Sequence, residues 1–418
     1  MKKTSVFKPN SIYAALDIGS SKIVCVVGKN NSNGEIEVLG YGSQATKSMK
    51  KGLIVNPSRI EEEIVFVVNE AAKITQTEIS SVILNANITN SKSVFLNGES
   101  EVGGSKIDEL HIRSSINNSK FYNVDDNFEI LHQIIRYFDI DKEKRVIDPT
   151  NFFADNLKVD IYQILVKKNY IKSLRNILNN ASLNIENIVS NPYASSLSTL
   201  IDDEKELGTI CIDLGAGTTS VCIIENNKLI FAHAIPVGGS NITYDLASGL
   251  NTSIEEAERI KTLYGSVFSN PSDEHELIDV PMIGSDKNRF NQINISYVNS
   301  FIKPRVEETL ELVRQKLKEY NLHKKNFRRV VLTGGGSLLE GINEYAKIIF
   351  DSQIRTGYPK KIEGINSGLN KPQFATVLGL LSSIQYNRQN SQFFHENSEK
   401  NEKNGLFSKF FRWLEPYI

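Results

Sequence analysis

The chain has 418 residues, with 48 Lys or Arg against 49 Asp or Glu, so its formal net charge at pH 7 is −1. This length exceeds that of one ordinary hydrophobic core and predicts two or more domains. The balanced charge provides no broad positive field, which argues against a general nucleic-acid binder and against nucleic acid as a partner.

The ends and the cysteines narrow the class further. The N-terminal residues contain no apolar stretch like the core of a secretory signal, so we expect the protein to remain in the cytoplasm. The three cysteines, Cys25, Cys211 and Cys222, lie in apolar runs that predict buried strands. Neither they nor the six histidines have the spacing of metal ligands, so we expect core thiols and no side-chain metal cage.

The first predicted elements are strands around a tight turn. Residues 13–28, YAALDIGSSKIVCVVG, have two apolar runs around a Gly-Ser-Ser-Lys centre, which predicts a hairpin. A helix follows at residues 58–75, where Ser58 and Glu61 have the spacing of a capping box. Residues 81–87 predict the next strand.

The pattern changes at residues 89–166, which contain no glycine turn of the phosphate-binding kind, and we expect an inserted subdomain there. Within it, residues 126–140 predict a polar helical stretch and residues 158–166 a strand. Residues 168–183 then have apolar side chains at helical spacing, which predicts a return to the main domain.

The opening pattern recurs at residues 209–224, TICIDLGAGTTSVCII, where Asp213 takes the place of Asp17. Two copies about half a chain apart predict two related α/β halves, with a cleft of nucleotide size between them. The second copy leads through a further strand to a Gly238-Gly239 turn and a helix.

The remainder of the second half predicts helices, a loop and one more strand. Thr252 is the expected N-cap of a helix with Glu255 at its third position, and a polar loop follows at residues 265–291. Residues 293–320 predict a long helix in which Pro304 marks a kink or a boundary. Residues 328–350 predict a strand, a triple-glycine turn and a helix.

The glycine turns carry the chemistry. Glycine allows the backbone to approach a phosphate, amides and hydroxyls donate to its oxygens, and a carboxylate holds hydrated Mg²⁺. One Asp-x-Gly turn alone is usually only a hairpin, but two at equivalent places predict a nucleotide site, with Asp213 holding Mg²⁺ through water and Asp17 beside it. The candidate nucleotide-binding residues in the turns are Asp17, Gly19, Ser20, Ser21, Lys22, Asp213, Gly215, Gly217, Thr218, Thr219, Gly238, Gly239, Gly334, Gly335 and Gly336.

The last residues form an amphipathic segment. On a helical wheel one face of residues 405–418 gathers Leu406, Phe407, Phe410, Phe411, Trp413, Leu414, Tyr417 and Ile418. The segment is too short for a membrane span, which needs about 20 apolar residues. After the polar spacer 385–404, which we expect to be a flexible linker, it predicts a reversible membrane anchor. The alternative is a helix docked on its own domain.

Four motifs occur in the order of the phosphate-1, phosphate-2, adenosine and connecting motifs of the actin-like ATPase superfamily: the Asp17 hairpin, IDLGAGTT, TGGG and PQFATVLGLL. Within that superfamily the chain resembles the FtsA family of bacterial cell-division proteins over essentially its whole length. The likeness includes MKKGLIVNP, IPVGGSNITYDLA, IEEAERIKTLYG, RRVVLTGGGSLLEGI and the closing helix.

This resemblance implies an α/β fold, namely an actin-like (ribonuclease-H-like) duplicated ATPase fold with an inserted α+β subdomain and a C-terminal amphipathic helix. The implied division is a first lobe 1A at residues 1–88 and 167–205, an inserted subdomain 1C at 89–166, a second lobe at 206–384 whose part 2B covers about 240–325, a linker at 385–404 and a membrane helix at 405–418.

The resemblance also implies ATP and Mg²⁺ as cofactors, and assembly into filaments on the cytoplasmic face of the inner membrane at the division septum. Glu258 and Lys261 would face the ribose and adenine with Ser337, the alternative for the first two being an exposed helix face. The partners would be membrane lipids, later divisome proteins through the inserted subdomain, and the C-terminal peptide of FtsZ. Arg289 and Arg305 would contact that peptide, unless they form only a solvated surface.

Two positions depart from the family pattern. Asn191 stands where relatives often carry a carboxylate that orients the attacking water, and an amide cannot accept a proton. We therefore expect slow or negligible hydrolysis, with Asp17 and Asp213 the only catalytic candidates and nucleotide acting mainly as an assembly ligand. The segment LNANITN lacks a glycine that relatives tend to have, which leaves the edge of the inserted subdomain open.

Other classes built on the same core fit the sequence less well. A sugar or acetate kinase needs a further catalytic carboxylate, and a pilus-assembly actin homologue has less reason to end in an amphipathic helix. A chaperone of the seventy-kilodalton class is excluded because no peptide-binding β domain follows the ATPase.

Overall fold

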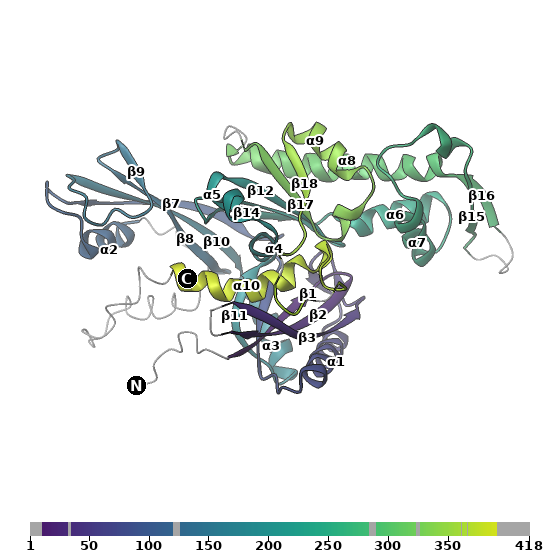
Figure 1. Cartoon of the computed structure of the whole chain (residues 1–418), viewed down its shortest axis with the longest axis horizontal. Helices are drawn as coiled ribbons and strands as arrows, with labels where there is room; N and C mark the ends of the chain where they lie inside the picture. Colours follow the sequence, from purple (N-terminus) through teal and green to yellow (C-terminus); the bar gives the residue numbers. More distant parts are fainter. Residues whose placement is uncertain are drawn as a thin grey trace.

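The computed structural model describes residues 11–31, 35–119, 126–283, 290–322, 327–360, 362–365 and 367–390. Two α/β lobes lie one above the other, the inserted subdomain projects at one end, and a smaller subdomain of the second lobe projects at the other (Figure 1). The predicted membrane helix at residues 405–418 and the predicted partner contact Arg289 lie outside the described residues.

The first lobe is built on a five-stranded sheet of order β11-β6-β1-β2-β3. Its strands are β1 (Ile12–Ile18), β2 (Lys22–Asn30), β3 (Ile36–Ala45), β6 (Ser81–Ala86) and β11 (Asn184–Ser190). β1 is antiparallel to β2 and parallel to β6, so the turn after β1 and the end of β6 meet at one edge of the sheet. A short hairpin, β4 (Met49–Lys50) and β5 (Leu53–Ile54), precedes the first helix.

The second lobe repeats this connectivity. Its sheet has the order β14-β13-β12-β17-β18, with β12 antiparallel to β13 and parallel to β17. The strands are β12 (Thr209–Leu214), β13 (Thr219–Glu225), β14 (Lys228–Ile235), β17 (Arg329–Thr333) and β18 (Gln353–Thr356). The duplication predicted from the two Asp-x-Gly turns is therefore present in the strand order itself.

Helices cover both sheets and fill the space between them. α1 (Pro57–Thr75) and α3 (Lys168–Asn180) cover the outer face of the first sheet, while α9 (Ile342–Phe350) lies against β18. α4 (Asn191–Thr199) and α10 (Ala375–Asn390) pack against each other between the lobes, and α5 (Asp202–Leu207) leads into β12 (Figure 1). α10 runs to Asn390, past the position where we expected the flexible linker to begin.

The inserted subdomain is a sheet with one helix. Its strands β7 (Lys92–Glu101), β8 (Phe128–Ile140), β9 (Lys144–Val146) and β10 (Asn156–Lys167) pair antiparallel in the order β7-β10-β8-β9, and α2 (Glu109–Asn117) packs on β7 and β10. The prediction of a helix at residues 126–140 was wrong, because this stretch is β8. The register of β8 against β10 shifts twice and its faces are mixed, so its apolar residues do not alternate as in an ordinary strand.

The smaller subdomain of the second lobe contains more structure than predicted. It consists of α6 (Gly239–Gly249), α7 (Ile254–Tyr264), the 3₁₀ turn Pro271–Glu274, the hairpin β15 (Leu277–Pro281) and β16 (Phe290–Asn294), and α8 (Ile295–Glu319). The predicted loop at residues 265–291 thus contains a 3₁₀ turn and a strand. Pro304 is no boundary, because α8 continues through it with Ile302 and Val306 both buried on either side.

Two predicted helix starts are corrected by the side-chain contacts. Asn56, and not Ser58, caps α1, since its Oδ1 accepts from the Arg59 amide at 3.2 Å. Ser253, and not Thr252, caps α7, and the Thr252 hydroxyl donates instead to the Pro281 carbonyl at 2.7 Å. In each case a neighbouring residue with a similar capping side chain competes for the same amide.

The hydrophobic core includes the apolar residues of the predicted strands. Cys25, Cys211 and Cys222 are buried and free, as expected of core thiols. Among the described residues there is no cluster of potential metal-ligating side chains, and none of their helices is long and apolar enough to cross a bilayer.

Candidate nucleotide-binding site

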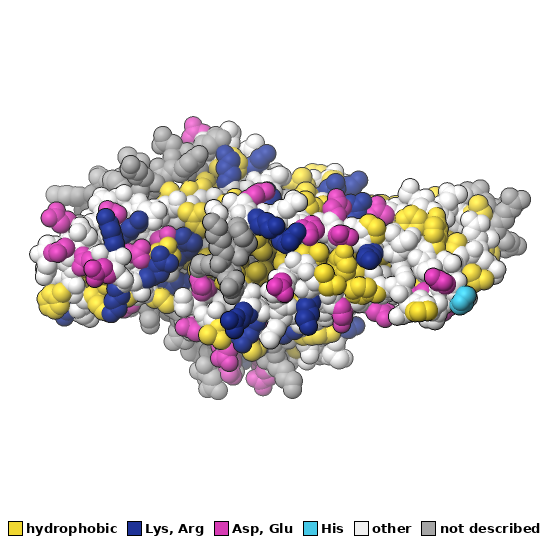
Figure 2. Space-filling model, turned by 90° about the horizontal axis from the view of Figure 1, so that it is seen from above, with side chains coloured by type: hydrophobic (Ala, Val, Ile, Leu, Met, Phe, Trp, Pro, Cys, Tyr) yellow, Lys and Arg dark blue, Asp and Glu magenta, His cyan; other side chains and the backbone are white. Residues whose placement is uncertain are grey.

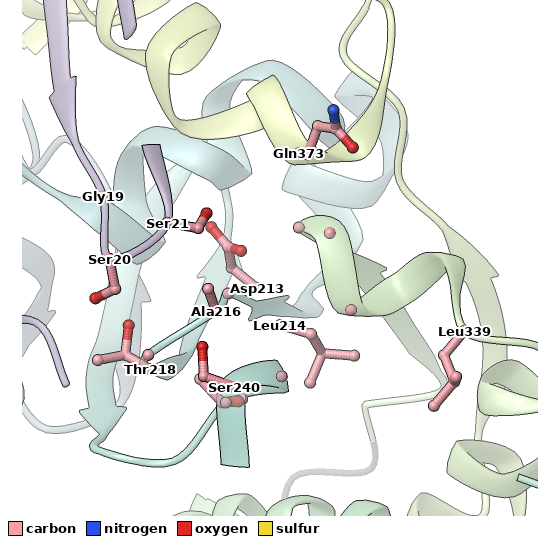
Figure 3. Close-up of a pocket in the computed structure, with 18 of the residues that line it drawn as sticks. Gly19, Ser20, Ser21, Asp213, Leu214, Ala216, Thr218, Ser240, Leu339 and Gln373 are labelled. Carbon is pink, nitrogen blue, oxygen red and sulfur yellow. The ribbon is translucent and has the colours of Figure 1, made fainter. Parts of the chain in front are cut away.

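A cavity of about 780 Å³ lies between the two lobes. It is lined by every predicted nucleotide-binding residue except Ser337. Figure 3 shows Asp213 near its centre, between Ser21 of the first turn and Ala216 and Thr218 of the second. Ser337 is buried, and its hydroxyl donates to the Gly334 carbonyl at 2.7 Å, so it shapes the triple-glycine turn from behind.

The two Asp-x-Gly turns have the same internal hydrogen bond. The Gly19 amide donates to the Lys22 carbonyl at 3.0 Å, and the Gly215 amide donates to the Thr218 carbonyl, also at 3.0 Å. The turns face each other closely, since a Cβ added at Gly217 would lie 2.4 Å from the Ser20 Oγ. Amides and hydroxyls of both lobes therefore point into one narrow space, which is the arrangement that holds a polyphosphate.

Each turn carries a carboxylate near the end of its first strand, buried at Asp17 and half-buried at Asp213. The Asn85 side-chain amide donates to Asp17 Oδ1 at 2.8 Å, and the Thr376 hydroxyl donates to Asp213 Oδ2 at 3.1 Å. Burial raises the pKa of Asp17 to about 7, which Lys22 partly opposes and the charge of Asp213 increases. Burial likewise raises the pKa of Asp213 to about 6, against the hydrogen bond from Thr376.

These raised pKa values predict a pH dependence of stability in the protein without nucleotide or metal. Because the folded protein holds both protons more tightly than the unfolded chain, whose carboxyl pKa is near 3.8, the free energy of unfolding should fall as pH rises from about 4 to about 7. Asp17→Asn should remove much of this fall and raise stability at pH 7.5 by at least about 1 kcal/mol. Urea unfolding at pH 5 and pH 7.5 in EDTA measures the difference.

The comparison with Asp17→Asn cancels the titrating groups that do not interact with Asp17, while Lys22 and Asp213, which are coupled to its charge, contribute to the difference together with it. Equal pH slopes for the parent and Asp17→Asn would show that the Asp17 carboxyl is not perturbed. Mg²⁺ with nucleotide should act in the opposite sense, since a cation favours the ionised carboxylates.

The Lys22 side chain is half-buried and interacts with the charges of Asp17 and Asp213. Its Nζ lies 3.5 Å from the centre of the Phe374 ring, and burial lowers its pKa to about 8, with the carboxylates of Asp17 and Asp213 opposing that shift. A lysine at this pKa is still mostly protonated at pH 7. It therefore places a positive charge beside the carboxylates where a phosphate would lie.

The residues present fit a nucleotide with its cation. A Cβ at Gly238 would lie 2.6 Å from the carbonyl oxygens of Gly215 and Ala216, and one at Gly334 would lie 2.3 Å from Asp213 Oδ1. These glycines leave room that any side chain would fill. Thr219 is among the lining residues, and its buried hydroxyl has no hydrogen-bond partner among the described residues. A buried hydroxyl without a partner is unfavourable, and a ligand oxygen would satisfy it.

Glu258 and Lys261 lie on the cavity wall and are not simply on an exposed helix face. Lys261 Nζ lies 2.6 Å from Glu258 Oε2 and donates to the Thr243 hydroxyl at 2.9 Å and the Gly239 carbonyl at 3.2 Å. Lys261 thus joins α7 to the start of α6 beside the glycine turn. Both residues therefore line the cavity beside the Gly238-Gly239 turn.

Several lining residues were missed by sequence reasoning. Asn87 directly follows β6, and Gly52, Gln373 and Thr376 come from distant segments. Asn85 in β6, which donates to Asp17, was missed as well. A signal existed for Asn85, a polar residue at the end of an apolar strand. The Asn85 amide also donates to Asn191 Oδ1 at 3.2 Å, so Asn191 lies on the cavity wall near Asp17.

The predicted partner contact Arg305 is already paired. Its guanidinium donates to both carboxylate oxygens of Asp245, at 2.6 and 3.0 Å, and also contacts Glu308. Figure 2 shows Lys and Arg interspersed with Asp and Glu over the face it displays, without a continuous basic stripe. An acidic partner would therefore have to compete with the carboxylates that surround Arg305.

Comparison with protein families gives two matches. The model for the cell division protein FtsA matches residues 210–379, and the model for the SHS2 domain inserted in FtsA matches residues 88–165. The cell division protein FtsA of Rhizobium meliloti strain 1021 is 33% identical over 385 residues, covering 90% of this chain and 87% of the relative. That of Bacillus subtilis strain 168 is 28% identical, covering 89% and 83%.

Solved structures with the same fold are more distant in sequence. The PilM–PilN complex of type IV pilus biogenesis aligns with a TM-score of 0.62 at 16% identity, covering 90% of this chain and 99% of that chain. MreB5 of Spiroplasma citri bound to ADP aligns with a TM-score of 0.54 at 14% identity, covering 91% and 98%. At such identities the likeness establishes the fold, and the predicted actin-like fold with an inserted subdomain is confirmed.

Proposed function

Because this chain belongs to the FtsA family of bacterial cell division proteins, we propose that it binds ATP, polymerises on the cytoplasmic face of the inner membrane and tethers the FtsZ ring there. The observation that supports the proposal is the pair of equivalent Asp-x-Gly turns around one cavity, each with a carboxylate whose pKa is raised by burial. Family membership supports the filament formation and the septal location that we propose.

ATP would lie between the lobes with its phosphates against the two turns. Asp213, and Asp17 beside it, would hold Mg²⁺ through water, and the metal would neutralise phosphate charge. Glu258, Lys261 and the triple-glycine turn would hold the ribose and base. Closing of the lobes around the nucleotide would then bring surfaces of the two halves into the relative position that assembly requires.

Hydrolysis should be slow. Asn191 lies on the cavity wall near Asp17, but its amide oxygen accepts a hydrogen bond from Asn85 and cannot take a proton from water. We expect nucleotide to act mainly as an assembly ligand. Steady turnover at or above roughly 1 s⁻¹ would contradict this assignment.

Electron microscopy on a lipid monolayer tests the proposal as a whole. With ATP and Mg²⁺ the full-length protein should form rows on the monolayer, and without nucleotide the rows should be fewer or absent. Equilibrium binding of ATP in solution is measured alongside. Protein that binds ATP but never forms rows would refute assembly, while protein that binds no adenine nucleotide would refute the site.

The FtsZ peptide should dock on the smaller subdomain of the second lobe, which contains α8 and the β15–β16 hairpin. Charge reversal at Arg289 and Arg305 should abolish binding of an acidic, apolar peptide and leave ATP binding intact. Since Arg305 is held by Asp245, the matched control Asp245→Asn should free the guanidinium and strengthen peptide binding. Fluorescence anisotropy with the FtsZ C-terminal peptide measures both changes.

An unchanged peptide affinity in the charge-reversed protein would place the contact elsewhere.

Later divisome proteins would bind the inserted subdomain, residues 89–166 in the division proposed from the sequence, which leaves the smaller subdomain free for FtsZ. A kinase would need a further catalytic carboxylate near the phosphates. Within the part of the chain that the structure describes, the cavity lining adds to Asp17 and Asp213 only Glu258, which is paired with Lys261, and Glu340, which follows the triple-glycine turn.

A further inference from the structure

The inserted subdomain touches the second lobe through a fully buried tyrosine. The Tyr162 hydroxyl on β10 accepts from the Ala232 amide at 2.8 Å and donates to the Ala232 carbonyl at 3.1 Å. Ser93 on β7 lies 2.9 Å from the same hydroxyl and 3.3 Å from the Ala232 carbonyl. Ala232 lies on β14, an edge strand of the second sheet, so side chains of the inserted subdomain satisfy backbone groups that no strand pairs.

An aromatic cluster surrounds this contact and includes residues of both parts. Phe95 of the inserted subdomain stacks on Tyr162 at 5.1 Å between ring centres, and Tyr320 at the end of α8 lies 4.8 Å from Phe231 and 6.1 Å from Phe95. The Arg136 guanidinium lies 4.6 Å above the Phe95 ring. Rings packed in this way resist sliding, because they have few alternative close-packed arrangements.

The same inserted sheet holds the first lobe at a second buried point. His132 on β8 accepts from the Ser190 amide at 3.0 Å through Nε2, and burial lowers its pKa to about 4, so the imidazole is neutral and can accept. Its ring also meets the edge of Tyr193 at 5.7 Å. Ser190 ends β11 and directly precedes Asn191 on the cavity wall.

β14 continues from Ala232 toward the phosphate end of the cavity. It ends at Ile235, and the Gly238-Gly239 turn that follows lines the cavity, where the Gly239 amide donates to the Gly215 carbonyl at 2.9 Å. Figure 1 shows the root of the inserted sheet, at β8 and β10, beside β14 on the side of the molecule away from the smaller subdomain. One short extended segment therefore joins the inserted subdomain to the phosphate turn.

We propose that the inserted subdomain is a brace across both lobes, whose orientation follows the angle between them, and that Tyr162 is the positioning residue that couples it to the second lobe. The proposal rests on the nucleotide function proposed above, since nucleotide is what changes that angle. A nucleotide drawing the two turns together moves β14 relative to β11, and the inserted sheet, held at Ala232 and at Ser190, must rotate with them.

The experiment measures the orientation of the brace directly in the full chain. The native cysteines Cys25, Cys211 and Cys222 are at most 1% exposed, so spin labels react selectively at Glu143→Cys in the inserted subdomain and Lys347→Cys on α9. Pulsed electron resonance gives the distance between the labels, without nucleotide and with Mg²⁺ and the non-hydrolysable analogue AMPPNP. Affinity for AMPPNP is measured on each variant by calorimetry.

The parent should show one narrow distance that shifts when AMPPNP binds. Tyr162→Phe should broaden the distribution and lose at least half of the shift, with AMPPNP affinity changed by no more than about threefold. Ser93→Ala is a milder variant that serves if Tyr162→Phe folds poorly, and it should change the distance distribution in the same direction. The matched control Ser100→Ala removes a buried hydroxyl that bonds the His111 carbonyl within the inserted subdomain, and it should leave the shift intact.

Narrow, equally shifting distances in both Tyr162→Phe and Ser93→Ala would overturn the proposal. So would a parent that binds AMPPNP without any shift. A parent that binds no AMPPNP refutes the nucleotide function instead, and the brace is then decided by the nucleotide-free distance alone: broadening in Tyr162→Phe supports it and an unchanged width overturns it.

Discussion

Removing residues 405–418 should release the protein from lipid vesicles, with at least about a 100-fold loss of the membrane-bound fraction relative to free protein. The apolar side chains of this segment, at half burial, contribute about 1 kcal/mol each. The cost of ordering a short helix reduces the sum to on the order of 5 kcal/mol, which is marginal for one chain. In the filament proposed above, many such segments would bind as one unit, because each further insertion would be effectively intramolecular.

The source of the binding can be separated by two matched variants. Phe410→Glu with Trp413→Glu places charges on the apolar face and should act like the deletion. Lys409→Ala with Arg412→Ala alters the opposite face and should retain most of the binding, because Glu415 already offsets part of that charge and the binding is expected to come mainly from the apolar face. Vesicle co-sedimentation measures all four proteins. Deletion without effect on sedimentation would mean that the segment docks on the protein itself.

The duplicated core could be predicted from the sequence because its signals are local. Asp17 and Asp213 each end a continuous apolar run and start a glycine turn. Both patterns can be recognised without knowing which strands lie beside them. The glycines were identifiable for the same reason, since close backbone approach admits no other residue at Gly238 or Gly334.

What the sequence could not supply are contacts between distant segments. Thr376 donates to Asp213 across 163 positions and Asn85 donates to Asp17 across 68. No residue close in sequence to either carboxylate therefore indicates its hydrogen-bond partner. Arg305 was expected to be available to a peptide, yet Asp245, which is 60 positions away, holds it. These contacts depend on how the sheets and helices pack.

The prediction for the residues of β8 was wrong for a different reason. It is a central strand with two register shifts, so its apolar residues cover parts of both faces and imitate a helical spacing. Its partners β10 and β9 follow it in the chain, and only their pairing decides between the two periods. The same strand carries His132, whose bond to Ser190 was equally invisible before the inserted sheet was placed.

Gly238→Ala should lower the affinity for ATP by at least about 100-fold, because the new methyl group has no space. Its Cβ would lie 2.6 Å from the carbonyl oxygens of Gly215 and Ala216 and 2.8 Å from the Thr218 amide nitrogen, all backbone atoms of the second phosphate turn. Relief requires α6 to move away from that turn. The bonds from the Gly239 amide to Gly215 and from the Ser240 amide to Ala216, at 2.9 and 2.8 Å, would then break.

The loss should be specific to the site and separable from general destabilisation. Gly42→Ala is the matched control, since its Cβ would lie 2.2 Å from the Val67 carbonyl, between β3 and α1 and away from the cavity lining. Both variants should melt at lower temperature, because both force backbone apart. Only Gly238→Ala should lose affinity for ATP. Calorimetry measures this affinity at a temperature below the melting temperatures of both variants. Equal affinities in the two variants would show that the start of α6 takes no part in holding the phosphates, and that the two Asp-x-Gly turns hold them alone.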